Sequence, residues 1–264
     1  MKVVRRGAAP LVTFAALMGV WLTITYGVLS EDRRFLMPPP QDVLRMGFMD
    51  WASLQPMLEA LLLTTEVAMA GLVIATVLGV AIAVLMSQAK WVENAVYPYA
   101  VVLQTIPILA VVPLIGFWFS FGFNSRVIVC VLIALFPLIA NTLFGLQSVD
   151  ERHADLFALH KAGRWTRLVK LQLPTALPAL FTGLRIAAGL AVIGAVVGDM
   201  FFRQGEPGIG TLLDVYRSRL QSEQLFAAII LSSLLGIAVF CVFGVLGRLA
   251  VGSWSSFGGQ SRER

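Results

Sequence analysis

The chain has 264 residues, of which 58% are hydrophobic and 13% are charged, and its mean hydropathy is +0.83. Soluble domains carry roughly 25% charged residues, so this composition excludes an ordinary soluble protein and indicates one polytopic membrane bundle. The formal charge of +5 is explained better by basic loops on one side of a membrane than by nucleic-acid binding. Both cysteines fall in apolar stretches and predict no disulfide framework.

An apolar stretch at residues 11–29 follows the basic start MKVVRRG. This pattern is similar to a secretory signal peptide, but the stretch is long enough to cross a bilayer, which takes about 20 apolar residues. The charged residues Glu31 to Arg34 follow it, rather than a small-residue cleavage site. We therefore expect an uncleaved first helix, followed by an external connector over residues 30–60.

The second predicted span covers residues 61–86. Ala75, Gly79 and Ala83 repeat in it at four-residue spacing, which predicts close helix packing because small residues on one face let helices approach. Glu66 lies toward the outer end of this span, where an interfacial position and a pair with another helix are both possible.

The third predicted span covers residues 95–119 and contains Pro107 and Pro113. These prolines are expected to kink or interrupt it, and broken helices are tolerated at membrane depth where they line a cavity or are buried in protein. Gln104 and Thr105 lie next to the expected kink. They are candidates for the translocation path, and interhelical hydrogen bonding is the alternative role for each.

The fourth and fifth predicted spans cover residues 127–146 and 181–202. Asn141 in the fourth must find hydrogen-bond partners, either in helix packing or in the translocation path. Asp199 stands near the end of the fifth, where an acid is energetically expensive. It is either a gate or substrate residue, or the partner of Arg203 one helical turn later.

The segment RQGEPGIG at residues 203–210 is glycine-rich but lacks the GK[ST] ending of a phosphate-binding loop. We expect it outside the membrane, either as a contact for a binding protein or as a plain connecting turn. A sixth span is predicted over residues 225–249, followed by a basic tail ending in SRER.

A charged stretch at residues 148–180 separates the fourth and fifth spans. Ser148 and Glu151 have capping-box spacing and predict a helix start. Gly163 is placed to end that helix. A second short helix is expected from Trp165 onward, ending near Pro174 because proline lacks a backbone donor. The sequence therefore predicts a compact helical hairpin.

Six spans put both termini on the same side as this hairpin. If that side is the cytoplasm, 13 of the 20 lysines and arginines lie inside and seven lie outside. The positive-inside rule therefore favours this orientation.

The hairpin resembles the EAA loop of ABC importer permeases, in the branch that serves nitrate, sulfonate, taurine and thiamine-precursor uptake. Asp155 stands at the acidic position of that loop, residues 162–165 match its Ala-Ser-Arg-Trp run, and residues 173–178 match its LP-x-ALP ending. The runs IPILAVVPLIGFWFSFG and FPLIANT in the third and fourth spans resemble the same family, and the resemblance extends over residues 36–249.

The hairpin departs from the family pattern at two places. Lys161 stands where the family usually has a glycine, and Leu156 and Phe157 replace small alanines. The resemblance nevertheless implies that the hairpin docks an ATPase subunit. The residues expected to couple are Asp155, Leu156, Phe157, Leu159, Lys161, Ala162, Gly163, Arg164 and Trp165.

The resemblance implies an all-α polytopic membrane bundle of the MetI-like type I importer fold, with residues 1–264 forming a single permease domain. It implies two ABC ATPase subunits carrying ATP and Mg, a second permease copy in a homodimer, and an extracytoplasmic substrate-binding protein. The expected place is the bacterial inner membrane, among its lipids, with both termini cytoplasmic. No catalytic residue, metal, cofactor or nucleic-acid partner is implied for this chain. The implied cargo is a small polar solute of the sulfonate, nitrate, taurine or vitamin-precursor type.

Two other function classes remain in view. A self-sufficient secondary transporter or channel often has internal repeats and midplane charges, but no repeat is evident and the only deep acids are Glu66 and Asp199. An integral membrane enzyme needs a cluster of catalytic side chains on facing spans, and none is evident. The chain has no Walker motif, so ATP must be bound by another subunit if ATP drives it.

Overall fold

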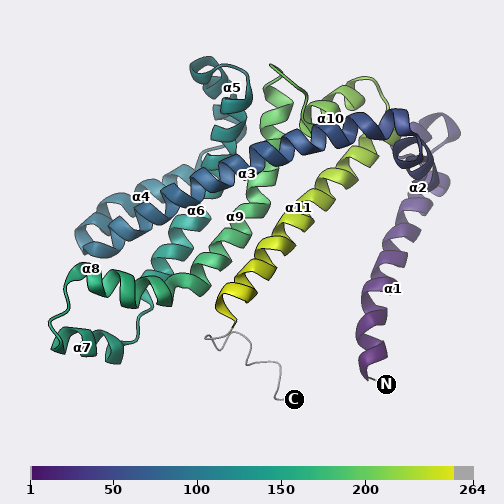
Figure 1. The fold of residues 1–264 in the computed structure, drawn as a ribbon. Helices are drawn as coiled ribbons and strands as arrows, with labels where there is room; N and C mark the ends of the chain where they lie inside the picture. The colour runs from purple at the N-terminus through teal and green to yellow at the C-terminus, as the bar shows by residue number, and fades with distance from the viewer. Residues whose placement is uncertain (1, 253–264) are drawn as a thin grey trace.

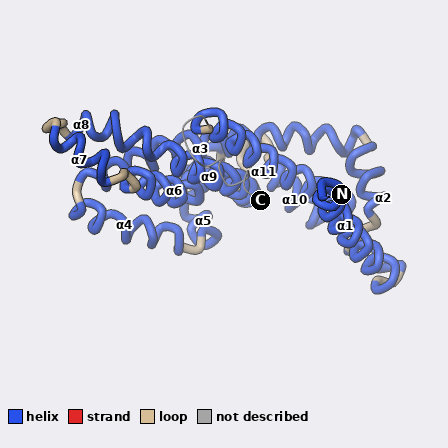
Figure 2. Tube along the Cα trace, turned by 90° about the horizontal axis from the view of Figure 1, so that it is seen from below, coloured by secondary structure: helices blue, strands red, loops and turns tan. Residues whose placement is uncertain are grey.

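The computed structural model describes residues 2–252, with side chains from residue 10 onward, and contains no strand within that range (Figures 1 and 2). The basic side chains of the N-terminal anchor and the SRER tail lie outside the described residues. Five described helices are long and apolar enough to cross a membrane, and a bent helix pair supplies a sixth. The predicted all-α polytopic bundle is therefore confirmed.

Six helical units have the length and apolarity of membrane spans. They are α1 (Lys2–Thr23) with the π-turn η1 (Ile24–Val28), α3 (Trp51–Gln88), the pair α4 (Lys90–Thr105) and α5 (Ile108–Phe119), α6 (Phe123–Gln147), α9 (Leu173–Phe201) and α11 (Ser222–Val251). Shorter helices join them, namely η2 (Glu31–Leu36), α2 (Pro40–Asp42), η3 (Val43–Met49), α7 (Glu151–Leu159), α8 (Arg164–Arg167), η4 (Leu168–Gln172) and α10 (Ile209–Ser218).

The start of α1, the end of α11 and the α7–α8 hairpin lie toward one end of the molecule, whereas α2 and α10 lie toward the other (Figure 1). The first helix stands at the edge of the bundle, where the Trp21 ring lies 5.3 Å from the ring of Phe226 in α11. This arrangement agrees with an even number of spans between the two ends of the chain.

The helix α3 begins about ten residues earlier than the sequence predicts. Asp50 caps it by accepting hydrogen bonds from the Ala52 backbone N–H at 3.2 Å and from the Ser53 hydroxyl at 2.8 Å. Its 38 residues extend over about 57 Å, whereas the hydrocarbon core of a bilayer is about 30 Å thick. Much of the expected external connector is therefore helical.

The predicted interruption of the third span is confirmed at one proline only. The axes of α4 and α5 differ by 98° across a break at Ile106 and Pro107. Pro113 lies inside α5 and does not interrupt it. The difference arises because Pro107 follows an extended residue, whereas Pro113 sits within the second turn of a helix that tolerates the missing donor.

Small residues set the closest helix approaches in the bundle, where α6 packs against both α3 and α9. Ala75, Gly79 and Ala83 are all buried, as their spacing predicts. A Cβ atom at Gly79 would lie 2.8 Å from the Cβ of Leu138, and one at Gly194 would lie 2.9 Å from the Cα of Cys130. Larger side chains at these glycines would force the helices apart.

The expected helix end near Pro174 is wrong. The chain continues from α8 through the π-turn η4 directly into α9, and Pro174 occupies the first turn of α9. Pro174 directly follows the π-turn η4, where the regular hydrogen-bond pattern of the helix is already interrupted, so its missing N–H is accommodated. The hairpin is therefore joined to a membrane helix without an intervening loop.

Candidate functional sites

The α7–α8 hairpin starts at a different cap from the predicted one. The Asp150 side chain caps α7 by accepting a hydrogen bond from the Arg152 N–H at 2.8 Å. The Ser148 hydroxyl instead donates to the Gly145 carbonyl at 2.8 Å, at the end of α6. Because α6 runs on to Gln147, a carbonyl group of its last turn accepts the Ser148 hydroxyl, and Ser148 does not cap α7.

The turn between α7 and α8 is a Schellman motif centred on a lysine. Lys161 has φ of +50°, its N–H donates to the Ala158 carbonyl at 2.9 Å, and the Ala162 N–H donates to the Phe157 carbonyl at 3.0 Å. This left-handed position normally favours glycine. The predicted C-cap role of Gly163 is wrong, since Gly163 is extended at φ −65° and precedes α8 as its N-cap.

Three apolar side chains of the hairpin face solvent. Leu159 is 80% exposed, Trp165 is 77% exposed and Leu156 is also exposed, while no residue of α7 is buried. An apolar surface of this kind on a charged element marks a contact for another molecule. The remaining predicted coupling residues are exposed or half-buried, namely Asp155, Phe157, Lys161, Ala162, Gly163 and Arg164.

The hairpin is anchored to the bundle by the turn that follows α8. Leu168 and Leu171 of η4 are buried, and Leu168 packs in a core cluster with Met86 of α3 and Leu146 of α6. Leu159 and Trp165 themselves do not pack against the bundle, since both are more than three-quarters exposed. From α8 through η4 to α9 the chain is continuous helix.

At the other end of the molecule, Asp199 is 0% exposed and pairs with Arg126, which is 1% exposed. The Arg126 Nη1 lies 3.3 Å from the Asp199 Oδ1. The Thr64 hydroxyl donates to the Asp199 Oδ2 at 2.6 Å and accepts a hydrogen bond from the Ile209 N–H at 2.9 Å. We refer to Thr64, Arg126, Asp199 and residues 203–210 as the Asp199 cluster.

Arg126 also binds the backbone of the loop that follows α9. Its guanidinium donates to the carbonyls of Phe202 at 2.7 and 3.1 Å, of Glu206 at 3.1 Å and of Gln204 at 3.3 Å. A buried cation is tolerated only when such donors are used. Backbone carbonyls of residues 202–206 therefore surround the guanidinium, while residues 203–207 remain exposed and residues 208–210 are buried.

The predicted pair of Asp199 with Arg203 is wrong. The helix α9 ends at Phe201, and Phe202 is extended, so Arg203 does not lie one helical turn after Asp199. Arg203 instead forms an exposed ion pair with Asp214 of α10. The sequence signal for this pair is that Arg126 immediately precedes the predicted span 127–146, while Asp199 lies near the end of the predicted span 181–202.

Two glycines allow α10 to close over Asp199. A Cβ at Gly208 would overlap the Asp199 carboxylate, and one at Gly210 would overlap the Val196 carbonyl. The Thr211 hydroxyl donates to the Asp199 carbonyl at 2.7 Å.

On the same helix, burial raises the pKa of the Tyr216 phenol, so Tyr216 remains uncharged at neutral pH.

Of the three remaining candidate residues of the translocation path, Gln104 and Asn141 line two separate cavities and Thr105 lines neither. Gln104 lines a cavity of about 520 Å³ between α4, α5, α6 and α9, where it is the one polar side chain in the described lining. Thr105 does not line that cavity, and its hydroxyl donates to the Val102 carbonyl at 2.8 Å. Asn141 lines a cavity of about 250 Å³ beside Thr175 and Thr182, and its amide donates to the Pro137 carbonyl at 2.8 Å.

Residues 75–251 match the family described as "Binding-protein-dependent transport system inner membrane component". The chain is 34% identical over 241 residues to the formylaminopyrimidine transport permease protein ThiX of Halalkalibacterium halodurans, covering 91% of this chain and 93% of ThiX. It is 27% identical over 248 residues to the nitrate import permease protein NrtB of Leptolyngbya laminosa, covering 93% and 88%. The crystal structure of an amino acid ABC transporter has a similar fold, with a TM-score of 0.56 at 19% identity, covering 74% of this chain and 92% of that chain.

Proposed function

The chain belongs to the family of binding-protein-dependent transport system inner membrane components, and we propose that its α7–α8 hairpin couples solute passage to ATP hydrolysis on separate subunits. Membership makes the chain the multi-pass permease component of an ABC importer, a transport subunit of the inner membrane. The proposal adds the residues that couple, the partners and the cargo.

The observation that carries the coupling proposal is the exposed apolar surface of the hairpin. Leu159 and Trp165 are more than three-quarters exposed on an otherwise charged element, so an ATPase with an apolar cleft would bury them. Asp155 and Arg164 supply charges beside that surface. Apolar and aromatic anchors that enter a pocket commonly carry much of the binding energy of an interface.

Substitution of Leu159 tests the coupling directly. Leu159→Asp places a charge in the proposed cleft, and ATPase recovered with the purified permease should fall at least about tenfold. Leu159→Met keeps an apolar side chain of similar volume and should retain the ATPase. Both variants should insert and fold normally because this side chain has no contacts in the bundle to lose. Full ATPase retention and ATP-driven uptake in Leu159→Asp would contradict the proposal.

The proposed assembly has two permease copies, two ATPase subunits and an external binding protein, with the hairpin and both chain ends in the cytoplasm. The positive-inside bias supports this orientation, as does the position of the hairpin opposite α10 (Figure 1). A cysteine at Ser148 should react only with a cytoplasmic reagent and one at Gly205 only with an external reagent. Labelling of both from one side would contradict the orientation.

We propose that the cargo is a small uncharged heterocycle of the vitamin-precursor type. The cavity beside the α4–α5 break is lined by apolar side chains and Gln104, with no cation among its lining residues. Such a surface suits an aromatic ring with one hydrogen-bonding group better than an anion such as nitrate. The relative named for formylaminopyrimidine transport supports the same class.

Competition in the complete importer tests the cargo class. Unlabelled formylaminopyrimidine should inhibit uptake of the labelled heterocycle and should support ATP turnover by the importer. Nitrate and an aliphatic sulfonate should do neither. Gln104→Leu should reduce uptake of the heterocycle, while Thr105→Val should not because Thr105 lies outside the cavity lining. Uptake of nitrate in preference to the pyrimidine would overturn this assignment and leave the coupling proposal intact.

A further inference from the structure

Arg185 in α9 is a half-buried cation without a polar partner. It forms no ion pair or hydrogen bond with any described residue, and its Nε is buried without an acceptor. Its guanidinium carbon lies 3.9 Å from the centre of the Phe240 ring. Gly244 makes room for it, since a Cβ there would lie 3.2 Å from Nε. A cation inside a membrane span normally has an anionic or carbonyl partner.

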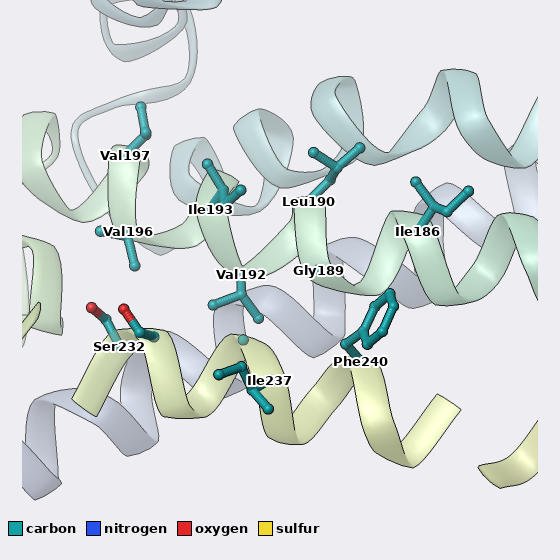
Figure 3. Close-up of a pocket in the computed structure, with 12 residues that line it drawn as sticks. Ile186, Gly189, Leu190, Val192, Ile193, Val196, Val197, Ser232, Ile237 and Phe240 are labelled. Carbon is teal, nitrogen blue, oxygen red and sulfur yellow. The ribbon is translucent and has the colours of Figure 1, made fainter. Parts of the chain in front are cut away.

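An apolar groove of about 600 Å³ lies between α9 and α11 (Figure 3). Its walls include Ile186 and Ile193 of α9 and Ile237 and Phe240 of α11. Figure 3 places Ile186 and Phe240 at one end of this groove, with Val197 toward the other. Because Phe240 also stacks on Arg185, the groove ends beside the unpaired guanidinium.

The dimensions of the groove match one bilayer leaflet. Eleven helical residues separate Ile186 from Val197, which corresponds to about 16 Å, and half of the hydrocarbon core is about 15 Å. Arg185 lies at the end nearer to the hairpin, because α9 starts at Leu173 and runs away from it. Arg185 therefore lies at the hairpin-side end of the groove.

We propose that this groove binds a phospholipid of the hairpin-side leaflet, with an acyl chain between α9 and α11 and the phosphate on Arg185. A guanidinium forms short, bidentate hydrogen bonds with phosphate, and basic pockets between membrane helices bind lipid headgroups. A second permease copy is the alternative occupant, and the crosslinking experiment below distinguishes it from a lipid. The groove adjoins the proposed cargo cavity, with which it shares Leu190 and Ile193, but it lies apart from the proposed ATPase contact.

Lipid retention by the purified full-length permease tests the site. The probe is phosphatidylglycerol titrated into nanodiscs of neutral lipid, with bound lipid counted by native mass spectrometry. Arg185→Gln removes the charge and should weaken retention about tenfold, whereas Arg185→Lys should restore part of it. Gly189→Leu should weaken retention similarly, because a side chain at Gly189 enters open space in the groove.

Two matched controls should retain the lipid as the unaltered chain does. Lys170→Gln removes an exposed cation near the start of α9, outside the groove lining. Gly19→Leu adds the same side chain at a glycine of α1 that also faces open space.

Three results would overturn the proposal. One is equal phosphatidylglycerol retention in the unaltered chain, Arg185→Gln and Gly189→Leu. Another is equal binding of inorganic phosphate or diacylglycerol, which would mean that the headgroup and the chain are not recognised together. The third is high-yield disulfide crosslinking between copies carrying Ile193→Cys, which would show that a second permease covers the groove.

Discussion

The Asp199 cluster and the α7–α8 hairpin differ in the source of their partners. In the cluster, the charges of Asp199 and Arg126 are buried and bound by other parts of the same chain. In the hairpin, the backbone is capped internally, but Leu159 and Trp165 remain exposed. Loss of the cluster should therefore unfold that end of the molecule, and the predicted gate or substrate role of Asp199 stays a prediction. The hairpin is the proposed ATPase interface, so its alteration should affect assembly and leave the fold unchanged.

The largest expected effect follows from removing one member of the buried ion pair. Arg126→Gln leaves the Asp199 carboxylate buried without its cation and frees the carbonyls of residues 202–206. Breaking a buried pair in this way costs about 3–5 kcal/mol. We expect loss of most folded permease after detergent extraction, measured by gel filtration and thermal unfolding.

A double-mutant cycle distinguishes the ion pair from a general packing effect. Arg126→Met with Asp199→Leu removes both charges and should be more stable than either single variant, with a coupling of about 0.5–3 kcal/mol. Arg203→Gln removes the exposed partner of Asp214 and should cost only about 0–1 kcal/mol. Additive effects of the two buried substitutions would contradict the assigned pair.

A pair of glycine substitutions compares the two ends at smaller cost. Gly210→Ala places a methyl group against the Val196 carbonyl in the cluster, and overpacking of this kind costs about 1–3 kcal/mol. Gly163→Ala in the hairpin places its methyl group in open space and should change stability by less than about 0.5 kcal/mol. Thermal unfolding of the two variants in parallel gives the comparison, and equal losses would mean that the loop is not closed over Asp199.

Thr64 tests whether the cluster is held by hydrogen bonds as well as by charge. Thr64→Val keeps the shape of the side chain but removes the donor to Asp199 and the acceptor for the Ile209 N–H. Leaving buried polar groups unpaired costs about 1–3 kcal/mol. Thr65→Val is the matched control, because the Thr65 hydroxyl bonds only within its own helix, to the Leu61 carbonyl. Equal stability of the two variants would contradict the bridging role of Thr64.

The difference between the two regions also explains what the sequence could predict. The break at Pro107 and the buried faces of Ala75, Gly79 and Ala83 depend on local pattern, and they were predicted correctly. The partner of Asp199 depends on where α9 ends, and no local pattern marked Phe202 as extended. Arg203 therefore looked correctly spaced, although Arg126, distant in sequence, is the residue that reaches the carboxylate.

The sequence predicts a helical hairpin at residues 148–180 because this stretch contains charged residues and prolines, whereas the neighbouring spans are apolar. Its caps were placed wrongly, since Ser148 serves the end of α6 and Asp150 starts α7. The left-handed residue was also misassigned to Gly163. The useful signal is the resemblance to the EAA loop, whose usual glycine position corresponds to Lys161, and the structure gives that position a positive φ.

The smallest expected effect concerns this lysine. A left-handed conformation costs a non-glycine residue roughly 1–2 kcal/mol. Glycine avoids this cost, but its greater conformational freedom in the unfolded chain offsets roughly 0.4–1 kcal/mol of the gain in stability. Lys161→Gly should therefore stabilise the end of α7 by about 0.5–1 kcal/mol, which slows amide hydrogen exchange there about two- to fivefold. Lys161→Ala removes the same charge but keeps the strained backbone, so its exchange should match that of the unaltered chain. If Lys161→Ala slows exchange as much as Lys161→Gly does, charge rather than backbone strain limits the stability of this turn.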